Sequence, residues 1–148
     1  MLTSLKIIDH INTDTKIIDE ISLSYEDRFI RRKKLTANNG TEFLVNLEET
    51  KSVDENYYFK LDSGEVIKVI SKEENLMQIT SDNIKQIIWH IGNRHLPCQI
   101  EESRILIQED SVIKDMIIKL GGNVTNVVEK FKPEGGAYGM GRTHSHQH

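Results

Sequence analysis

The sequence has very little cysteine and proline, and it has no long apolar run. Cys98 is the single cysteine among 148 residues, which excludes an internal disulfide framework and a zinc site built from several cysteines. No apolar stretch approaches the roughly 18 residues that a membrane-spanning helix needs. The first ten residues also lack a basic segment followed by an apolar segment, the mark of a secretory signal. We therefore expect a cytoplasmic protein without membrane contact.

The composition is typical of a soluble globular protein with one ordinary domain or two small ones. Hydrophobic residues make up 37% of the chain and charged residues 28%. The 19 Lys and Arg against 23 Asp and Glu give a net charge of −4, which argues against a nucleic-acid partner. Histidine is the unusual component, because three of the six histidines lie in the last five residues.

The first 74 residues have the pattern of β-strands and no convincing helical period. Two turn signals, Asn38-Asn39-Gly40 and Asp62-Ser63-Gly64, each separate two strand-like runs. The basic run Arg31–Lys34 lies just before the first of these turns. Such a run usually marks a solvated sheet edge, although it would also attract an acidic partner. The pattern predicts a small antiparallel β domain over residues 1–74.

Residues 75–133 change to a mixed pattern, so the whole chain is predicted to be of the α+β class. Apolar residues recur at helical spacing through 81–93, where Ser81 or Asp82 is the expected cap. A second helix is predicted to begin at Asp110 or Ser111 and to end at Gly121-Gly122. With the strand-like segments around them, the order is β-α-β-β-α-β, the ferredoxin-like arrangement.

The last 15 residues, 134–148, are rich in glycine and end in alternating histidines. Their few apolar side chains do not offset the entropy of ordering them, so we expect a flexible arm. His144, His146 and His148 concentrate imidazole, a common ligand of transition metals, and favour metal binding. The competing interpretation is a solvated tail or the remnant of a purification tag, but tags are usually uninterrupted histidine runs.

The remaining candidate residues give weaker signals. His95 follows the first helix in an irregular stretch, and a lone histidine there more often has no special role. Cys98 is predicted to be a small core residue rather than a ligand or nucleophile. We interpret His10, in the first strand, and His90 as structural, and Trp89 as a packing or rim residue. The sequence contains no phosphate loop, HExxH or GxSxG motif, so we expect no enzymatic activity.

The stretch from Trp89 to Val124, which includes GNRH at residues 92–95, resembles the UreE family of urease accessory proteins, the nickel metallochaperones. The similarity extends over essentially the whole chain. It includes the hairpins NNGTEFLVNL (38–47) and LDSGEVIKVI (61–70), the segment PEGGAYG (133–139) and the His-containing end.

The resemblance implies a protein-contact role for the β domain and a metal-binding, dimer-forming role for the ferredoxin-like domain. It implies that His95 of two protomers meets at the dimer interface and holds Ni²⁺, with Zn²⁺ also accepted. The C-terminal ligands of the family fall on His144, His146 and His148. The implied partners are a second copy of the chain, the urease accessory GTPase and apo-urease. Where many relatives have histidines before the second helix, this chain has Glu109 and Ser111, so the resemblance does not extend to an auxiliary site there.

The requirement for several ligands also favours a dimer, because one histidine in the folded body cannot hold a divalent ion well. A two-fold axis turns His95 into two ligands. We therefore predict a nickel carrier that delivers Ni²⁺ for assembly of the urease active site. The alternative is a general zinc or nickel storage or buffering protein. An RNA-binding domain is disfavoured because the strands carry few aromatics, and a metal enzyme is disfavoured because no acid–base residue is apparent.

Overall fold

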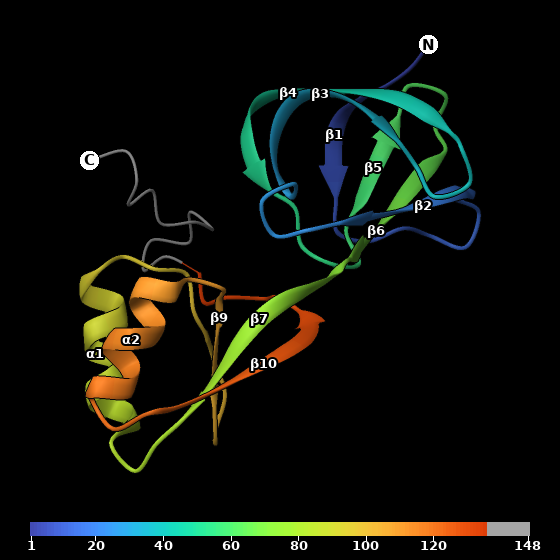
Figure 1. Cartoon of the computed structure of the whole chain (residues 1–148). Helices are drawn as coiled ribbons and strands as arrows, with labels where there is room; N and C mark the ends of the chain where they lie inside the picture. The colour runs from blue at the N-terminus through green and yellow to red at the C-terminus, as the bar shows by residue number, and fades with distance from the viewer. Residues whose placement is uncertain (136–148) are drawn as a thin grey trace. The chain divides into compact units, whose positions relative to one another are not determined.

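The computed structural model describes residues 1–135 of the chain. The chain divides into two compact units, Met1–Lys72 and Glu73–His148 (Figure 1). Neither helix in the described part has the length and apolar character that crossing a bilayer requires.

The N-terminal unit is a six-stranded sheet with the strand order β2-β6-β5-β1-β4-β3. Its strands are β1 (Leu2–Ile8), β2 (Ile17–Leu23), β3 (Phe29–Thr36), β4 (Glu42–Ser52), β5 (Tyr58–Leu61) and β6 (Val66–Ser71).

The prediction of an antiparallel β domain is wrong for two of the strand pairs. The hairpins β3–β4 and β5–β6 are antiparallel, and their turns place Gly40 and Gly64 at φ of 93° and 92°. However, β1 pairs with β4 and β2 pairs with β6 in parallel, which makes the sheet mixed. Turn signals determine only the direction of consecutive strands, whereas these parallel pairs join strands that are distant in sequence.

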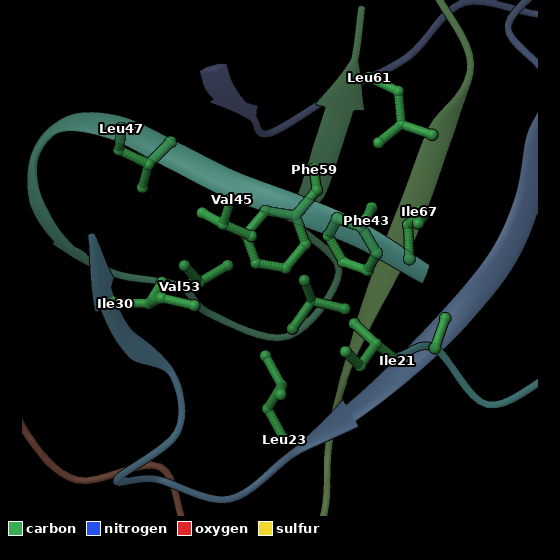
Figure 2. Packing of buried hydrophobic residues seen from close by; sticks show 12 residues of the cluster. Ile21, Leu23, Ile30, Phe43, Val45, Leu47, Val53, Phe59, Leu61 and Ile67 are labelled. Atoms are coloured by element: carbon green, nitrogen blue, oxygen red, sulfur yellow. The ribbon is translucent and has the colours of Figure 1, made fainter. Parts of the chain in front are cut away.

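The core of the N-terminal unit consists of side chains that alternate along the strands (Figure 2). Phe43, Val45 and Leu47 of β4 all point into it, as the two-residue period of a strand requires. The rings of Phe43 and Phe59 pack in a tilted arrangement, with centroids 5.5 Å apart.

A buried carboxylate ties the β3–β4 turn to β2. Asp19 accepts hydrogen bonds from the backbone N–H groups of Asn39 (3.1 Å), Thr41 (3.3 Å) and Glu20 (2.7 Å), and from the Asn39 side chain (3.0 Å). Burial alone would raise the pKa of the Asp19 carboxyl. The hydrogen bonds from Thr41, Glu20 and Asn39 outweigh that effect and hold the pKa below its usual value.

Replacing Asp19 should therefore destabilise the N-terminal unit. For Asp19→Ala we expect the free energy of unfolding to fall by about 2–3 kcal/mol, because buried N–H donors lose their acceptor. The exposed Asp14 is the matched control, and Asp14→Ala should leave stability unchanged. The Asp19 carboxyl has a lower pKa in the folded state. Its stabilising contribution should be present above the unfolded pKa of about 3.9 and lost as the pH falls through the folded pKa. Urea unfolding of both variants across the acidic range measures this, and equal losses in the two variants would contradict the role of Asp19.

The C-terminal unit is a four-stranded sheet, with two helices packed on one side of it in Figure 1. Its elements are β7 (Glu73–Thr80), α1 (Ile84–Asn93), β8 (Gln99–Ile100), β9 (Ile105–Gln108), α2 (Ser111–Lys119) and β10 (Asn123–Lys130). The strand order is β10-β7-β9-β8, and all neighbouring strands are antiparallel.

The apolar stripe predicted for α1 is confirmed, because Ile87 and Ile91 are buried against the sheet. The predicted cap of this helix is wrong. The N-cap residue is Asn83, and its side chain makes no capping hydrogen bond. The Ser81 hydroxyl instead accepts a hydrogen bond from the Asn83 N–H at 3.0 Å and donates one to the Gly121 carbonyl at 3.3 Å. It thereby links the start of α1 to the turn that follows α2.

An arginine joins three parts of the C-terminal unit. The Arg104 guanidinium donates to both carboxylate oxygens of Glu129 at 2.6 and 2.7 Å, to Glu101 at 3.1 Å and to Gln78 at 2.9 Å. The hydrogen bonds to Glu129, and then those to Glu101, raise the pKa of Arg104. The same contact lowers the pKa of Glu129. Bidentate pairs of this kind fix geometry as well as charge.

Candidate metal centre

The end of α1 has the hydrogen bonds of a Schellman motif. The Leu96 N–H donates to the Ile91 carbonyl at 3.3 Å, and the His95 N–H donates to the Gly92 carbonyl at 2.9 Å. These two bonds supply donors to carbonyls in the last turn of the helix, where the regular helical donors run out. They also make His95 the residue at which the chain leaves the helix.

His95 adopts a left-handed backbone conformation with φ of 57°. Glycine or asparagine usually occupies this position, and a histidine there costs about 1 kcal/mol of backbone strain. Two residues hold the turn in place: Ile91 is fully buried, and Leu96 packs against the same apolar cluster. The side chain of His95 is exposed, so the motif presents an imidazole at the surface on a fixed backbone.

Three side chains near the end of α1 lie close to His95 in the sequence: Trp89, His90 and Arg94. Arg94 Nη1 donates to the His90 carbonyl at 3.2 Å and places a positive charge at the negative end of the helix. The ring of His90 makes an edge contact with Trp89, with centroids 5.0 Å apart. Trp89 itself is 63% exposed, which is unusual for so large an apolar side chain and places it on the surface of the helix.

The segment before α2 lies beside the segment that follows His95. Leu96 and Pro97 line a small hollow of about 130 Å³ together with Glu109 and Asp110. α2 begins at Ser111, one of the two predicted starts, and Asp110 is its N-cap. The carboxylate of Asp110 accepts hydrogen bonds from the N–H groups of Val112 (2.9 Å) and Ile113 (3.1 Å). It therefore serves as the cap of the helix.

Cys98 is half-buried and packs against the apolar cluster under the helices. Burial raises the pKa of its thiol, and the negative charge of Glu134 raises it further. A thiol with a raised pKa is a poor metal ligand and nucleophile at neutral pH. This packing agrees with the prediction of a small core residue.

The residues that follow β10 form hydrogen bonds with Cys98 and with Gln99 at the start of β8. The Glu134 N–H donates to the Cys98 carbonyl at 2.9 Å, and the Lys132 N–H donates to the Gln99 side chain at 2.8 Å. The C-terminal segment, which begins at residue 134, is therefore attached to the fold at Cys98. Cys98 lies three residues after His95 in the chain.

Comparisons with known proteins match both units to one family. The model of the UreE urease accessory protein N-terminal domain matches residues 4–71, and the model of its C-terminal domain matches residues 74–148. The chain belongs to the UreE family of urease accessory proteins. Members of this family are accessory chaperones of urease maturation and not enzymes.

Individual UreE relatives align over most of their length. The urease accessory protein UreE of Ruegeria pomeroyi is 50% identical over 88% of this chain and 87% of its own length. The UreE of Rhodobacter capsulatus is 46% identical over 88% of this chain and 83% of its own. The UreE of Azorhizobium caulinodans is 37% identical and aligns with all of this chain and with 76% of its own length.

This chain does not assemble its predicted ligands within the described part. Among residues 1–135 no three His, Cys, Asp or Glu side chains come together as a group that could hold a metal ion. His95 is the one predicted ligand in that range. His144, His146 and His148 lie outside the described residues, so their predicted role stays a prediction.

His10 is not in the first strand, contrary to the prediction. β1 ends at Ile8, and the His10 side chain is 91% exposed with Nδ1 2.8 Å from an Asp9 oxygen. The apolar pattern of residues 5–8 continued into a polar pair, and no turn residue marked the end of the strand.

Two features of the site had almost no signal in the sequence. The helix-ending motif is usually recognised by glycine or asparagine at the left-handed position, and here that residue is His95 itself. The contact of Glu134 with Cys98 joins residues 36 positions apart through the backbone alone. Only the apolar character of Leu96, directly after the motif histidine, hinted at the anchored turn.

Proposed function

We propose that this chain is a nickel carrier that delivers Ni²⁺ for assembly of the urease active site. The observation that carries the proposal is the exposed His95 on an anchored helix-ending turn, three residues before Cys98, to which the backbone of Glu134 is bonded. The family's role in urease maturation supplies the context. Ni²⁺ accepts imidazole nitrogen readily, and Zn²⁺ is expected to compete for the same ligands.

The proposed centre needs a second copy of the chain, because a single His95 is too weak an anchor. We assign the C-terminal unit to the ferredoxin-like topology on its strand order and propose that this unit forms the homodimer. Apolar side chains on its helices support this, because Trp89 (63%), Val112 (73%) and Ile118 (51%) are exposed in the single chain. A two-fold axis at His95 then supplies two imidazoles.

We propose that His144, His146 and His148 complete the ligand set. Glu134 is held at Cys98, and the ten residues from there to His144 extend at most about 35 Å. That reach includes His95 of the same chain. A ligand set divided between His95 and the C-terminal histidines can be exchanged one ligand at a time, which suits delivery better than storage.

The proposed partners are the urease accessory GTPase and apo-urease, and the proposed setting is the cytoplasm. The N-terminal unit contributes protein contacts rather than metal ligands. A storage or buffering protein for zinc and nickel is the alternative, because the same histidines bind both metals.

Nickel transfer separates delivery from storage. The nickel-loaded chain is mixed with apo-urease and the accessory GTPase in the presence of a chelator that removes free Ni²⁺, and urease activity is measured. We expect activation by the loaded chain and none by the same amount of nickel salt. Activation that is no greater than with nickel salt would leave storage as the better interpretation.

A further inference from the structure

β3 lies at one end of the six-stranded sheet. One of its two backbone edges therefore has no strand partner among residues 1–135. Unpaired N–H and C=O groups along such an edge are a template for an added strand.

The exposed part of this edge strand carries four consecutive positive charges, Arg31, Arg32, Lys33 and Lys34. Lys34 lies 3.9 Å from Glu42, a weak and exposed pair, and Arg31 Nε donates to the Leu47 carbonyl at 3.5 Å. Within the described residues, Arg32 and Lys33 form no ion pair. Lys34 is therefore the one cation of the four that forms an ion pair among residues 1–135.

The basic side chains occupy both faces of β3. Lys33 is paired in register with the buried Val45, and Lys34 is paired with Leu44, so successive side chains point to opposite faces. Lys33 is nevertheless exposed, although its partner in β4 lies in the core. A strand added at this edge would have a cation beside its side chains on each face.

We propose that the free edge of β3 docks an acidic, extended segment of a partner protein, which pairs with residues 31–34 as an added strand. Opposite charges directly across a strand pair contribute roughly 0.2–1 kcal/mol each, and the edge offers four positions. The same charges prevent two copies of β3 from pairing with each other, so the edge selects against self-association and for an acidic strand.

A protein segment fits this edge better than a nucleic acid. Residues 1–72 carry 11 Lys and Arg against 13 Asp and Glu, so the strip is not part of a generally basic surface. Backbone pairing along an edge is also a contact that a peptide makes and a phosphodiester chain does not.

The test uses a short labelled peptide that alternates valine and glutamate, titrated with the full chain and followed by fluorescence anisotropy. The double variant Arg32→Glu/Lys33→Glu should weaken binding about tenfold or more, since two attractive pairs become repulsive. The control Lys85→Glu/Lys119→Glu makes the same charge change at exposed positions of the other unit and should leave binding unchanged. The same peptide methylated at alternate backbone nitrogens should also lose affinity, because it cannot pair as a strand.

Three results would overturn the proposal: no binding of the peptide, equal weakening by both double variants, or full affinity of the methylated peptide. Tighter binding of a single-stranded oligonucleotide of equal charge would overturn the choice of partner. None of these outcomes depends on nickel, so they leave the proposed metal function untouched.

Discussion

Replacement of His95 by alanine should lower the nickel affinity of the proposed dimer about a hundredfold or more. Loss of an outer-shell partner of a metal ligand already reduces affinity about 10–100-fold, and here one substitution removes a ligand from each protomer. Calorimetric titration of Ni²⁺ into the full chain measures the effect. His10→Ala is the matched control, because His10 is exposed in the N-terminal unit and has no proposed role.

A second substitution at the same position separates loss of a ligand from loss of the fold. His95→Gly removes the imidazole, but it also relieves the left-handed strain at φ of 57°. We expect the free energy of unfolding to rise by about 1 kcal/mol while nickel affinity falls as far as in His95→Ala. Wild-type affinity in either variant would show that His95 is not the anchor.

Nickel affinity should also fall, by about tenfold, when His144, His146 and His148 are all replaced by alanine. In the proposed ligand set these residues add to the anchor that His95 provides, so their loss should weaken binding without abolishing it. The substitutions keep the length of the chain and lie outside residues 1–135, so the dimer should persist. Calorimetry measures the affinity, and sedimentation of the same sample measures the oligomeric state.

Two outcomes would contradict this division of roles. If the triple variant binds nickel with full affinity, the C-terminal histidines are not ligands. If it binds none while His95→Ala binds normally, the anchor and the auxiliary ligands have been assigned the wrong way round. A control triple substitution at Thr143, Ser145 and Gln147 changes the same segment and should have no effect.

Patterns that are local in sequence predicted the elements of the fold well. Turn residues identified the β3–β4 and β5–β6 hairpins, and a helical period identified α1 and its buried Ile87 and Ile91. Non-local pairing was not predictable in the same way. The parallel pairs β1–β4 and β2–β6 depend on which distant strands bury their apolar faces together, and alternation carries no information about strand direction.

The candidate site was predictable only in part, for a related reason. The GNRH motif pointed to His95 as a candidate ligand. The left-handed backbone of His95, however, depends on the hydrogen bonds of the turn and on the packing of Leu96 against the apolar cluster. The buried Asp19 had no distinguishing signal, because an acidic residue in a strand usually points to solvent. The proposed ligand set is not contained in the fold of one chain, since it requires a symmetry partner.

Nickel stoichiometry in a chain that ends at residue 143 tests the shared His95 centre most directly. This truncation removes His144, His146 and His148 and leaves His95 as the one proposed ligand in each protomer. Calorimetric titration should then give a single weak site with one Ni²⁺ for every two chains, and the site should disappear in His95→Ala. One Ni²⁺ for each chain, or a site that survives His95→Ala, would contradict a centre shared across the dimer axis.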